Sequence, residues 1–421
     1  MPDPAANSSS FEDQDKQNKI NTPEISDIFS SSFANPPKFV DQVVLESISL
    51  TASDLLFEPR QEFIIVRVRI DGVLYELGTV SLQIYSQVSS RFKVLCNLDP
   101  TEKRKIQEGQ YSISDYNGAV VNLRVEIAQT IHGELIVIRI HKKETIIMDI
   151  TQLGFGNVAF TNYQNMLKER SGLILACGPT GCGKTTTLYS TLTILNEKKD
   201  LNIMTIENPV EFQLEDINQM QTQDDIGFTF ASGLKTILRL TPDVVLVGEI
   251  RDKETAEIAV ESGLTGQLVL STLHADDSVG ALFRLLDLGI ETYFVNSSLV
   301  GVISQRLVRR VCLSCKEVYN PTPAEIELFK EVMGRAPKQI VKGRGCPVCK
   351  NLGYKGRLGI FEVLVMNSSV RDLVRERMGE DVIRKKLVEG GFPTLLKDGL
   401  EKAEGGLTTI EEVLRSSFRV F

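Results

Sequence analysis

A glycine-rich stretch near the middle of the chain contains the residue types that bind phosphate. It fits the pattern G-x-x-x-x-G-K-[ST], in which glycines let backbone amides wrap a phosphate, the lysine neutralises its oxygens and the hydroxyl ligates Mg²⁺. An apolar run precedes the loop, and a sequence compatible with a helix follows it. The stretch therefore predicts a nucleotide-binding site with its magnesium ion. Its residues are Gly178, Pro179, Thr180, Gly181, Cys182, Gly183, Lys184, Thr185 and Thr186.

Three later segments end in side chains that could hydrolyse a bound nucleotide. Glu207 ends the run "TIE", Glu249 follows "DVVLVG", and His274 follows "QLVLSTL". Hydrolysis needs a carboxylate that positions or deprotonates water, a second acidic group for the metal and a group that senses the terminal phosphate. Ligands of parallel sheets bind at the carboxyl ends of the strands, so we expect all three side chains to face the same crevice as the loop.

Four of the seven cysteines form two C-x-x-C pairs, which predict a metal site. Two intervening residues let both thiolates of a pair reach one ion, and four sulfurs complete a tetrahedral shell, for which zinc is the natural occupant. A redox C-x-x-C usually acts alone, so the double pair disfavours disulfide chemistry. We expect a structural ion that does not contact the nucleotide. The ligands would be Cys312, Cys315, Cys346 and Cys349.

The elements that must position these residues change character along the chain. From 148 to 421, short apolar runs alternate with helical patterns, which is typical of a parallel sheet covered by helices. This part would include a cysteine-containing zinc subdomain at 305–360 and C-terminal helices at 368–421. From 39 to 147, alternating runs predict a small α+β domain. Residues 1–38 are polar and poor in large apolar side chains, so we expect a disordered tail.

The strands of the smaller domain have clear turn signals. "IIVRVRIDGVLYEL" predicts two strands joined by a tight hairpin at Asp71-Gly72, and "AVVNLRVEIAQTIHGELIVIRI" repeats the alternation. One helix, at about 82–98, interrupts the strands. The pattern predicts strands with a single intervening helix.

Composition and charge restrict the function classes. The chain has 421 residues, is 42% hydrophobic and has a formal net charge of -8, which disfavours an electrostatic grip on nucleic acid. No apolar run approaches the roughly 18 residues needed to cross a bilayer, and the N-terminal residues lack the features of a signal peptide. We expect a cytoplasmic, multidomain protein whose contact with a membrane is indirect, through partners.

Together these motifs resemble the secretion ATPases of type II secretion and type IV pilus assembly. The resemblance extends from about residue 40 to 421 and rests on "GPTGCGKTTTLYSTL", "TIENPVEF", "LRLTPDVVLVGEIRDKETAEIAVESGLTGQLVLSTLHADD" and the cysteine pairs. It implies a PAS-like N-terminal domain joined to a RecA-like ATPase domain, assembled as a homo-hexamer with ATP sites between domains. It also implies that the ATPase acts on inner-membrane platform proteins. The cysteine cluster favours assembly over retraction of pili.

The resemblance also assigns roles to individual residues. Lys184 and Thr185 would bind phosphate and magnesium. Glu207 would be the catalytic carboxylate, and Glu249 would be the acidic residue of an atypical Walker B strand that also helps to hold magnesium. His274 would be the second histidine of the His box. Arg124, in "LRVEI", would face the γ-phosphate, where a cation stabilises the charge of the transition state.

Several positions depart from the family pattern and leave alternatives open. The loss of a second arginine can cost about a thousandfold in turnover, so a nucleotide-binding scaffold with little hydrolysis remains an alternative. Type II secretion and pilus extension use the same site residues, and a related nucleic-acid translocase is a third possibility that the acidic charge disfavours. The polar N-terminal tail could dock on a partner and fold on contact. The departures are Leu56, Gln110, Asn208, Thr241, Gly248 and Gln267.

Overall fold

The computed structural model describes residues 19–20, 22–32, 35–141 and 148–417. The chain groups into two compact units, one of Met1–Glu144 with Gly345–Leu352 and the other of Thr145–Arg344 with Gly353–Phe421. Residues 1–18 of the tail expected at 1–38, and the domain boundary expected at 147, lie outside the described residues. The predicted mixed α/β fold is confirmed by the two large sheets of these units.

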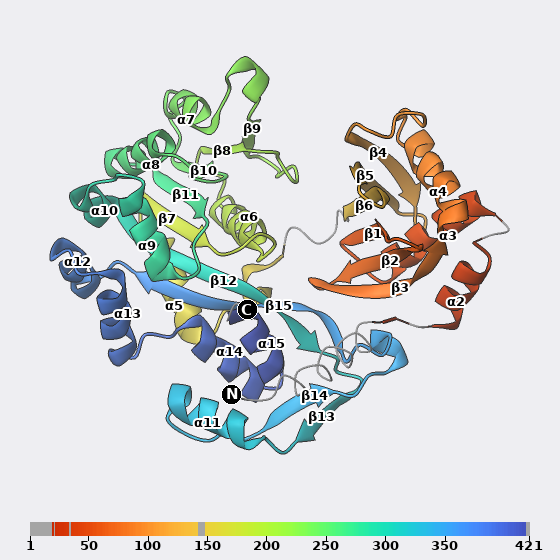
Figure 1. Ribbon diagram of the computed structural model, residues 1–421. Coiled ribbons are helices and arrows are strands. Elements are labelled where there is room, and N and C mark those ends of the chain that lie inside the picture. The colour runs from red at the N-terminus through yellow and green to blue at the C-terminus, as the bar shows by residue number, and fades with distance from the viewer. Residues whose placement is uncertain (1–18, 21, 33–34, 142–147, 418–421) are drawn as a thin grey trace, which may run out of the picture. The chain divides into compact units, whose positions relative to one another are not determined.

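The first unit is built on an antiparallel six-stranded sheet with the order β3-β2-β1-β6-β5-β4 (Figure 1). The predicted hairpin is confirmed, because Ile70 pairs with Val73 while Asp71 and Gly72 have φ values of 50° and 85°. Along β5, buried residues alternate with exposed ones, so one face of the strand packs into the core. The strands are β1 (Asp54–Pro59), β2 (Phe63–Ile70), β3 (Val73–Ser81), β4 (Gln107–Ser114), β5 (Val120–Thr130) and β6 (Gly133–His141).

Two helices of the first unit were not predicted from the sequence. Besides the expected helix, α4 (Leu82–Leu95), the structure contains α2 (Pro23–Ser30) and α3 (Pro36–Ser49). The predicted disorder is wrong for α2, because its Ile25 and Ile28 join the core of this unit and the Thr22 side chain caps its first turn. In α3 the buried valines recur at helical spacing, and the sequence analysis, which expected strands here, overlooked this signal.

The second unit contains a seven-stranded sheet with the order β15-β12-β7-β11-β10-β8-β9. All neighbouring pairs are parallel except β12 with β15. The predicted strands at the nucleotide loop and at the two glutamates are present, and their central residues are buried, as expected for a sheet covered on both faces. The strands are β7 (Gly172–Cys177), β8 (Ile203–Glu207), β9 (Asn218–Gln221), β10 (Val244–Val247), β11 (Leu268–Leu273), β12 (Leu299–Val311) and β15 (Tyr354–Val365).

Helices cover both faces of this sheet (Figure 1). Along β7, Leu173 and Leu175 belong to one core cluster and Ile174 to the other, because successive side chains point to opposite faces. The cluster of Ile174 includes α5 (Asn157–Met166) and α6 (Lys184–Leu195). The other cluster includes α7 (Phe230–Leu238), α8 (Lys253–Thr265), α9 (Ser278–Asp287), α10 (Thr292–Ser298), α12 (Ser368–Arg375) and α13 (Glu380–Glu389).

A smaller substructure follows β12. Strands β13 (Lys316–Tyr319) and β14 (Ile340–Gly343) form an antiparallel pair, joined by α11 (Pro323–Met333). Phe329 of α11 packs with residues of α14 (Leu395–Glu404) and α15 (Ile410–Ser417) in a separate core cluster. The pairing of β13 with β14 positions the segments that carry the cysteine motifs.

Candidate nucleotide-binding and metal sites

The phosphate-binding loop joins β7 to α6, as its sequence predicts. Its three glycines, Gly178, Gly181 and Gly183, have φ values of 143°, 76° and 94°. These are left-handed or related conformations that side chains with a Cβ rarely adopt, so the loop requires glycine at these positions. Helix α6 begins at Lys184, directly after the loop. The loop therefore directs the positive end of the helix towards the side where a phosphate would bind.

The polar side chains of the loop are available for a ligand. Lys184 Nζ donates to the carbonyl oxygens of Gly178 and Pro179, at 2.8 and 3.0 Å, which are bonds that phosphate oxygens can replace. Thr185 is exposed on the first turn of α6. Cys182 is 4% exposed, and burial raises the pKa of its thiol, so this cysteine fills space rather than acting as a reactive thiolate.

The three side chains expected at the strand ends lie on neighbouring strands of one sheet. Glu207 ends β8, Glu249 follows β10, and His274 follows β11, which is hydrogen-bonded to β7. Since these strands are parallel, their carboxyl ends are at the same edge as the phosphate-binding loop. The sheet thus brings together the polar residues that the sequence pattern grouped.

Glu249 and His274 are in direct contact. The carboxylate of Glu249 lies 3.7 Å from His274 Nε2 and 2.5 Å from a guanidinium nitrogen of Arg251. The side chain of Glu249 is 16% exposed, whereas those of His274 and Arg251 are 59% and 64% exposed, so a ligand can reach the cluster. A Cβ at Gly248 would lie 3.2 Å from Phe230 Cε1, which leaves little room for a larger residue there.

Glu207 is buried, and both of its carboxylate oxygens accept hydrogen bonds. Tyr189 on α6 donates its hydroxyl to Oε2. Thr205 Oγ1 and Gln219 Nε2 donate to Oε1, at 2.5 and 3.2 Å. Burial, followed by the hydrogen bond to Glu207, raises the pKa of Tyr189, so the phenol stays protonated as a donor. Thr205 lies on the same strand as Glu207, whereas Tyr189 and Gln219 come from other elements, and the sequence analysis missed all three partners.

Arg124 belongs to the first unit. It lies on β5 opposite Gln110 of β4, and its guanidinium pairs with Glu108, at 2.5 Å, and with Glu126, at 3.7 Å. The side chain of Arg124 is 44% exposed and those of its partners about half exposed. Such solvated pairs contribute little free energy, so Arg124 can exchange them for another anion at low cost.

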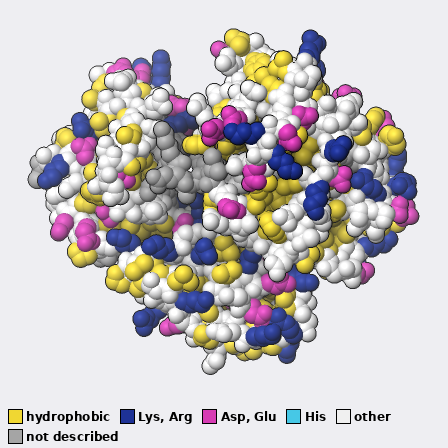
Figure 2. Space-filling view, turned by 180° about the vertical axis from the view of Figure 1, so that it is seen from behind, with side chains coloured by type: hydrophobic (Ala, Val, Ile, Leu, Met, Phe, Trp, Pro, Cys, Tyr) yellow, Lys and Arg dark blue, Asp and Glu magenta, His cyan; other side chains and the backbone are white. Residues whose placement is uncertain are grey.

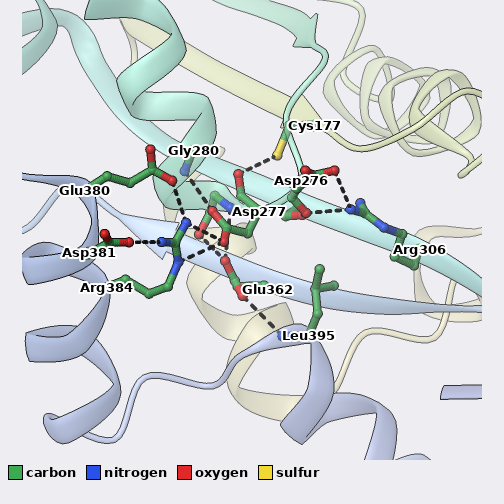
Figure 3. A network of polar contacts seen from close by, with 12 residues as sticks. Cys177, Asp276, Asp277, Gly280, Arg306, Glu362, Glu380, Asp381, Arg384 and Leu395 are labelled. Carbon is green, nitrogen blue, oxygen red and sulfur yellow. Dashed lines mark hydrogen bonds and ion pairs between the residues drawn. The ribbon is translucent and has the colours of Figure 1, made fainter. Parts of the chain in front are cut away.

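A polar network that the sequence analysis missed holds the loop after β11 (Figure 3). Asp277 caps α9 by accepting from Gly280 N at 2.7 Å, and it also accepts two hydrogen bonds from Arg384 of α13. Glu362 of β15 is 5% exposed and accepts from the backbone and hydroxyl of Ser278, and burial raises its pKa. These contacts fix the start of α9 just after the segment that carries His274.

The four cysteines of the two motifs come together. One possible ligand atom from each of them lies within 4.8 Å of every other, and Cys346 Sγ is 3.7 Å from Cys349 Sγ. A tetrahedral zinc ion with bonds of about 2.3 Å would separate its sulfurs by about 3.8 Å, so the spacing fits. The pairing of β13 with β14 and the hydrogen bond from Arg344 N to Cys315 O bring the two motifs together. The cluster of Cys312, Cys315, Cys346 and Cys349 is compatible with Zn²⁺.

This fold and loop define a P-loop nucleotide-binding protein of the mixed α/β class. The family model of the Type II/IV secretion system protein matches residues 31–415, so the chain belongs to that family. The Type II secretion system ATPase E of Vibrio cholerae is 41% identical over 378 residues, which cover 90% of this chain and 74% of the relative. The Type IV pilus assembly ATPase PilB of Myxococcus xanthus is 39% identical over 384 residues, which cover 90% of this chain and 67% of that protein.

Solved structures support the fold independently. The ATPase DotB of Yersinia pseudotuberculosis superposes with a TM-score of 0.67 at 20% identity, covering 91% of this chain and 94% of DotB. The pilus retraction motor PilT with bound ADP gives a TM-score of 0.57 at 24% identity, covering 89% and 95% of the two chains. The resemblance found in the sequence and the prediction of an ATP-hydrolysing enzyme are confirmed by the family and these relatives. Within the described ranges, no helix combines the length and the apolar character that a membrane span requires.

Proposed function

We propose that this ATPase couples ATP hydrolysis to the assembly of pilin-like subunits during type II secretion. One observation carries the proposal: a complete phosphate-binding loop stands in the same sheet as strands that end in or are followed by Glu207, Glu249 and His274. The chain that contains them is 41% identical to a type II secretion ATPase over 90% of its length. Hydrolysis would supply the free energy, and movement of the N-terminal unit would pass it on.

Each residue of the site has a proposed role. Lys184 binds the β- and γ-phosphates, and Glu207 positions the attacking water once the nucleotide rearranges its hydrogen bonds. Thr185 and Glu249 offer the hydroxyl and carboxylate oxygens that Mg²⁺ prefers, and the ion would neutralise phosphate charge when bound. His274 orients Glu249, and Arg124 stabilises the charge that develops on the γ-phosphate.

The working assembly is proposed to be a homo-hexamer in the cytoplasm. It would be peripheral to the inner membrane and would act on platform proteins there. A PAS-like N-terminal domain and a RecA-like ATPase domain with its zinc subdomain would form each protomer. The four-cysteine cluster supports this arrangement, because a structural ion can stiffen a small region that has little apolar core of its own.

Pilus extension is the second candidate, and the 39% identity to a pilus assembly ATPase supports it nearly as well. The two candidates differ in their partners. Purified platform proteins of a type II system and of a pilus system should therefore be compared for stimulation of phosphate release. Stimulation by the pilus platform alone would replace the first candidate by the second.

Hydrolysis is tested with the purified full chain. Phosphate release should depend on Mg²⁺ and should be lost in Lys184→Ala and reduced at least a hundredfold in Glu207→Gln. Nucleotide binding by the wild type, with phosphate release no faster than in Lys184→Ala, would instead favour the scaffold with little hydrolysis. Sedimentation with ATP and Mg²⁺ tests the hexamer, and a protein that stays monomeric would refute it.

Nucleic-acid translocation is tested separately. On the face shown in Figure 2, Lys and Arg side chains are interspersed with Asp and Glu rather than gathered into one basic surface. We therefore expect DNA retention to be weak and to vanish with moderate salt. Salt-resistant retention with DNA-stimulated phosphate release would favour the translocase.

A further inference from the structure

Strand β12 continues past the end of β7, alongside the phosphate-binding loop. The two strands pair in parallel up to Ser304, which lies opposite Cys177, the last residue of β7. The next residues of β12, Gln305 and Arg306, therefore lie beside the loop. A Cβ added to Gly178 would be 2.6 Å from the backbone oxygen of Gln305 and 3.0 Å from Nη1 of Arg306. The loop and this strand are thus in van der Waals contact.

Gln305 holds one peptide group of the loop. Gln305 is 2% exposed, and its Nε2 donates to the carbonyl oxygen of Cys182 at 2.9 Å. In a planar trans peptide the C=O and the following N–H point in opposite directions. Because the Cys182 carbonyl points to Gln305, the N–H of Gly183 points away from it. Gln305 therefore sets the direction of an amide that could donate to a phosphate.

Stability of the fold does not explain an amide at position 305. Within the described part of the chain, the buried Oε1 atom of Gln305 has no hydrogen-bond partner. A buried, unpaired acceptor costs folding free energy, which an apolar side chain of similar size would avoid. The hydrogen bond that the Gln305 amide donates to the Cys182 carbonyl therefore accounts for a glutamine at this position.

Arg306 links the loop to the segment that carries His274. Its Nη2 donates to the carbonyl oxygen of Asp276 at 2.6 Å and lies 3.7 Å from the Asp276 carboxylate (Figure 3). Its Nη1 donates to Gln305 O at 3.1 Å. The side chain of Arg306 is only 11% exposed. A planar guanidinium can make these bonds together, whereas a lysine ammonium lacks the fork that spans them.

We propose that Gln305 and Arg306 are positioning residues of the ATPase, acting through the loop and through His274. Gln305 keeps the Gly183 amide directed at the phosphates, and Arg306 keeps the segment after β11 in register with the start of the loop. This inference rests on the nucleotide site proposed above. It assigns nucleotide affinity to Gln305 and turnover to Arg306, so the two can be separated experimentally.

The variant Gln305→Glu tests the donor. A carboxylate cannot donate to the Cys182 carbonyl, so the Kd of a fluorescent ADP analogue should be about tenfold weaker than that of the wild type near pH 8. Burial raises the pKa of a carboxyl group, and the protonated form regains a donor. The ratio of the two Kd values should therefore return to within about twofold near pH 5.5. Gln305→Met, which has no donor at any pH, should stay weak throughout.

The variant Arg306→Lys tests the link to His274. We expect kcat to fall about tenfold while KM changes less than about twofold, because the nucleotide contacts remain. Arg310→Ala, at an exposed position of the same strand, is the matched control and should change neither constant. Circular dichroism at each pH verifies that the variants are folded.

The outcomes separate this inference from the proposed site. Wild-type affinity in Gln305→Glu near pH 8, a loss that does not reverse near pH 5.5, or wild-type kcat in Arg306→Lys would overturn the positioning roles if Lys184→Ala still abolishes binding. Binding that survives in Lys184→Ala would instead show that the nucleotide site itself is wrong.

Discussion

Replacing Tyr189 by phenylalanine tests how Glu207 is held. The substitution removes one hydroxyl and leaves the ring, which is fully buried, in place. That hydroxyl is the donor to Oε2 of Glu207, a carboxylate that is itself only 4% exposed. The variant therefore leaves one oxygen of a buried acid without that donor and creates almost no cavity.

The size of the effect follows from the charge of the partner. A hydrogen bond to a charged group contributes about 1.5–3 kcal/mol, against about 1 kcal/mol for a neutral pair. For a unit of this size, each kcal/mol shifts the melting temperature by roughly 2–4 °C. Tyr189→Phe should therefore lower the melting temperature of the second unit by roughly 3–12 °C.

Tyr163→Phe is the matched control. Tyr163 is also fully buried in the same core cluster, but its hydroxyl pairs with the neutral hydroxyl of Thr191. Tyr163→Phe should lower the melting temperature, measured by calorimetry without nucleotide, about half as much as Tyr189→Phe does. The kcat for phosphate release should fall about tenfold in Tyr189→Phe with KM unchanged, because Glu207 loses its orientation but contacts no phosphate. An equal or larger destabilisation in the control, or an unchanged kcat, would refute this account of Glu207.

Two further predictions concern the metal cluster and an acid-sensitive ion pair. Cys346→Ser should reduce the bound zinc, measured by atomic emission, from about one ion per chain to none. It should also destabilise the region around the cluster, because the free energy of metal binding contributes to the free energy of folding there. Full zinc retention would contradict a four-cysteine site. Arg335 donates two hydrogen bonds to Glu404, and these bonds, with one from Lys338 N, lower the pKa of Glu404 to about 2. A folded-state pKa below the unfolded one stabilises at pH values above about 4.5, and this stabilisation disappears as the pH falls towards 2. Arg335→Ala should therefore unfold at a higher pH in an acid titration followed by circular dichroism, and an unchanged midpoint would show that the pair is too exposed to matter.

Local patterns in the sequence were sufficient to identify the main elements of the site. The residues from Gly178 to Thr185 are contiguous, so their types and spacing determine the loop directly. Glu207, Glu249 and His274 follow strands, and the rule for parallel sheets places them at one edge without any knowledge of the packing. The two cysteine motifs are similarly short and regular.

Partners that are distant in sequence could not be predicted in this way. Gln305 and Cys182 are 123 positions apart, and Arg384 meets Asp277 from 107 positions away. Nothing local marks such a glutamine or arginine, since each looks like an ordinary strand or helix residue. The disorder expected around α2 failed for a related reason, because Ile25 and Ile28 suffice once the core of the same unit covers them.

The long strand β12 has a mechanical consequence. Gln305 and Arg306 lie beside the phosphate-binding loop, and Cys312 follows directly after the strand ends at Val311. Roughly 20 Å of extended chain thus runs from the nucleotide to the metal cluster. Pairing with β15 restrains this segment along most of its length, so the segment is stiff and a displacement at one end would move the other end too. Because Val311 still pairs with Tyr354 of β15, the far end of β12 would keep its place without an ion in the cluster.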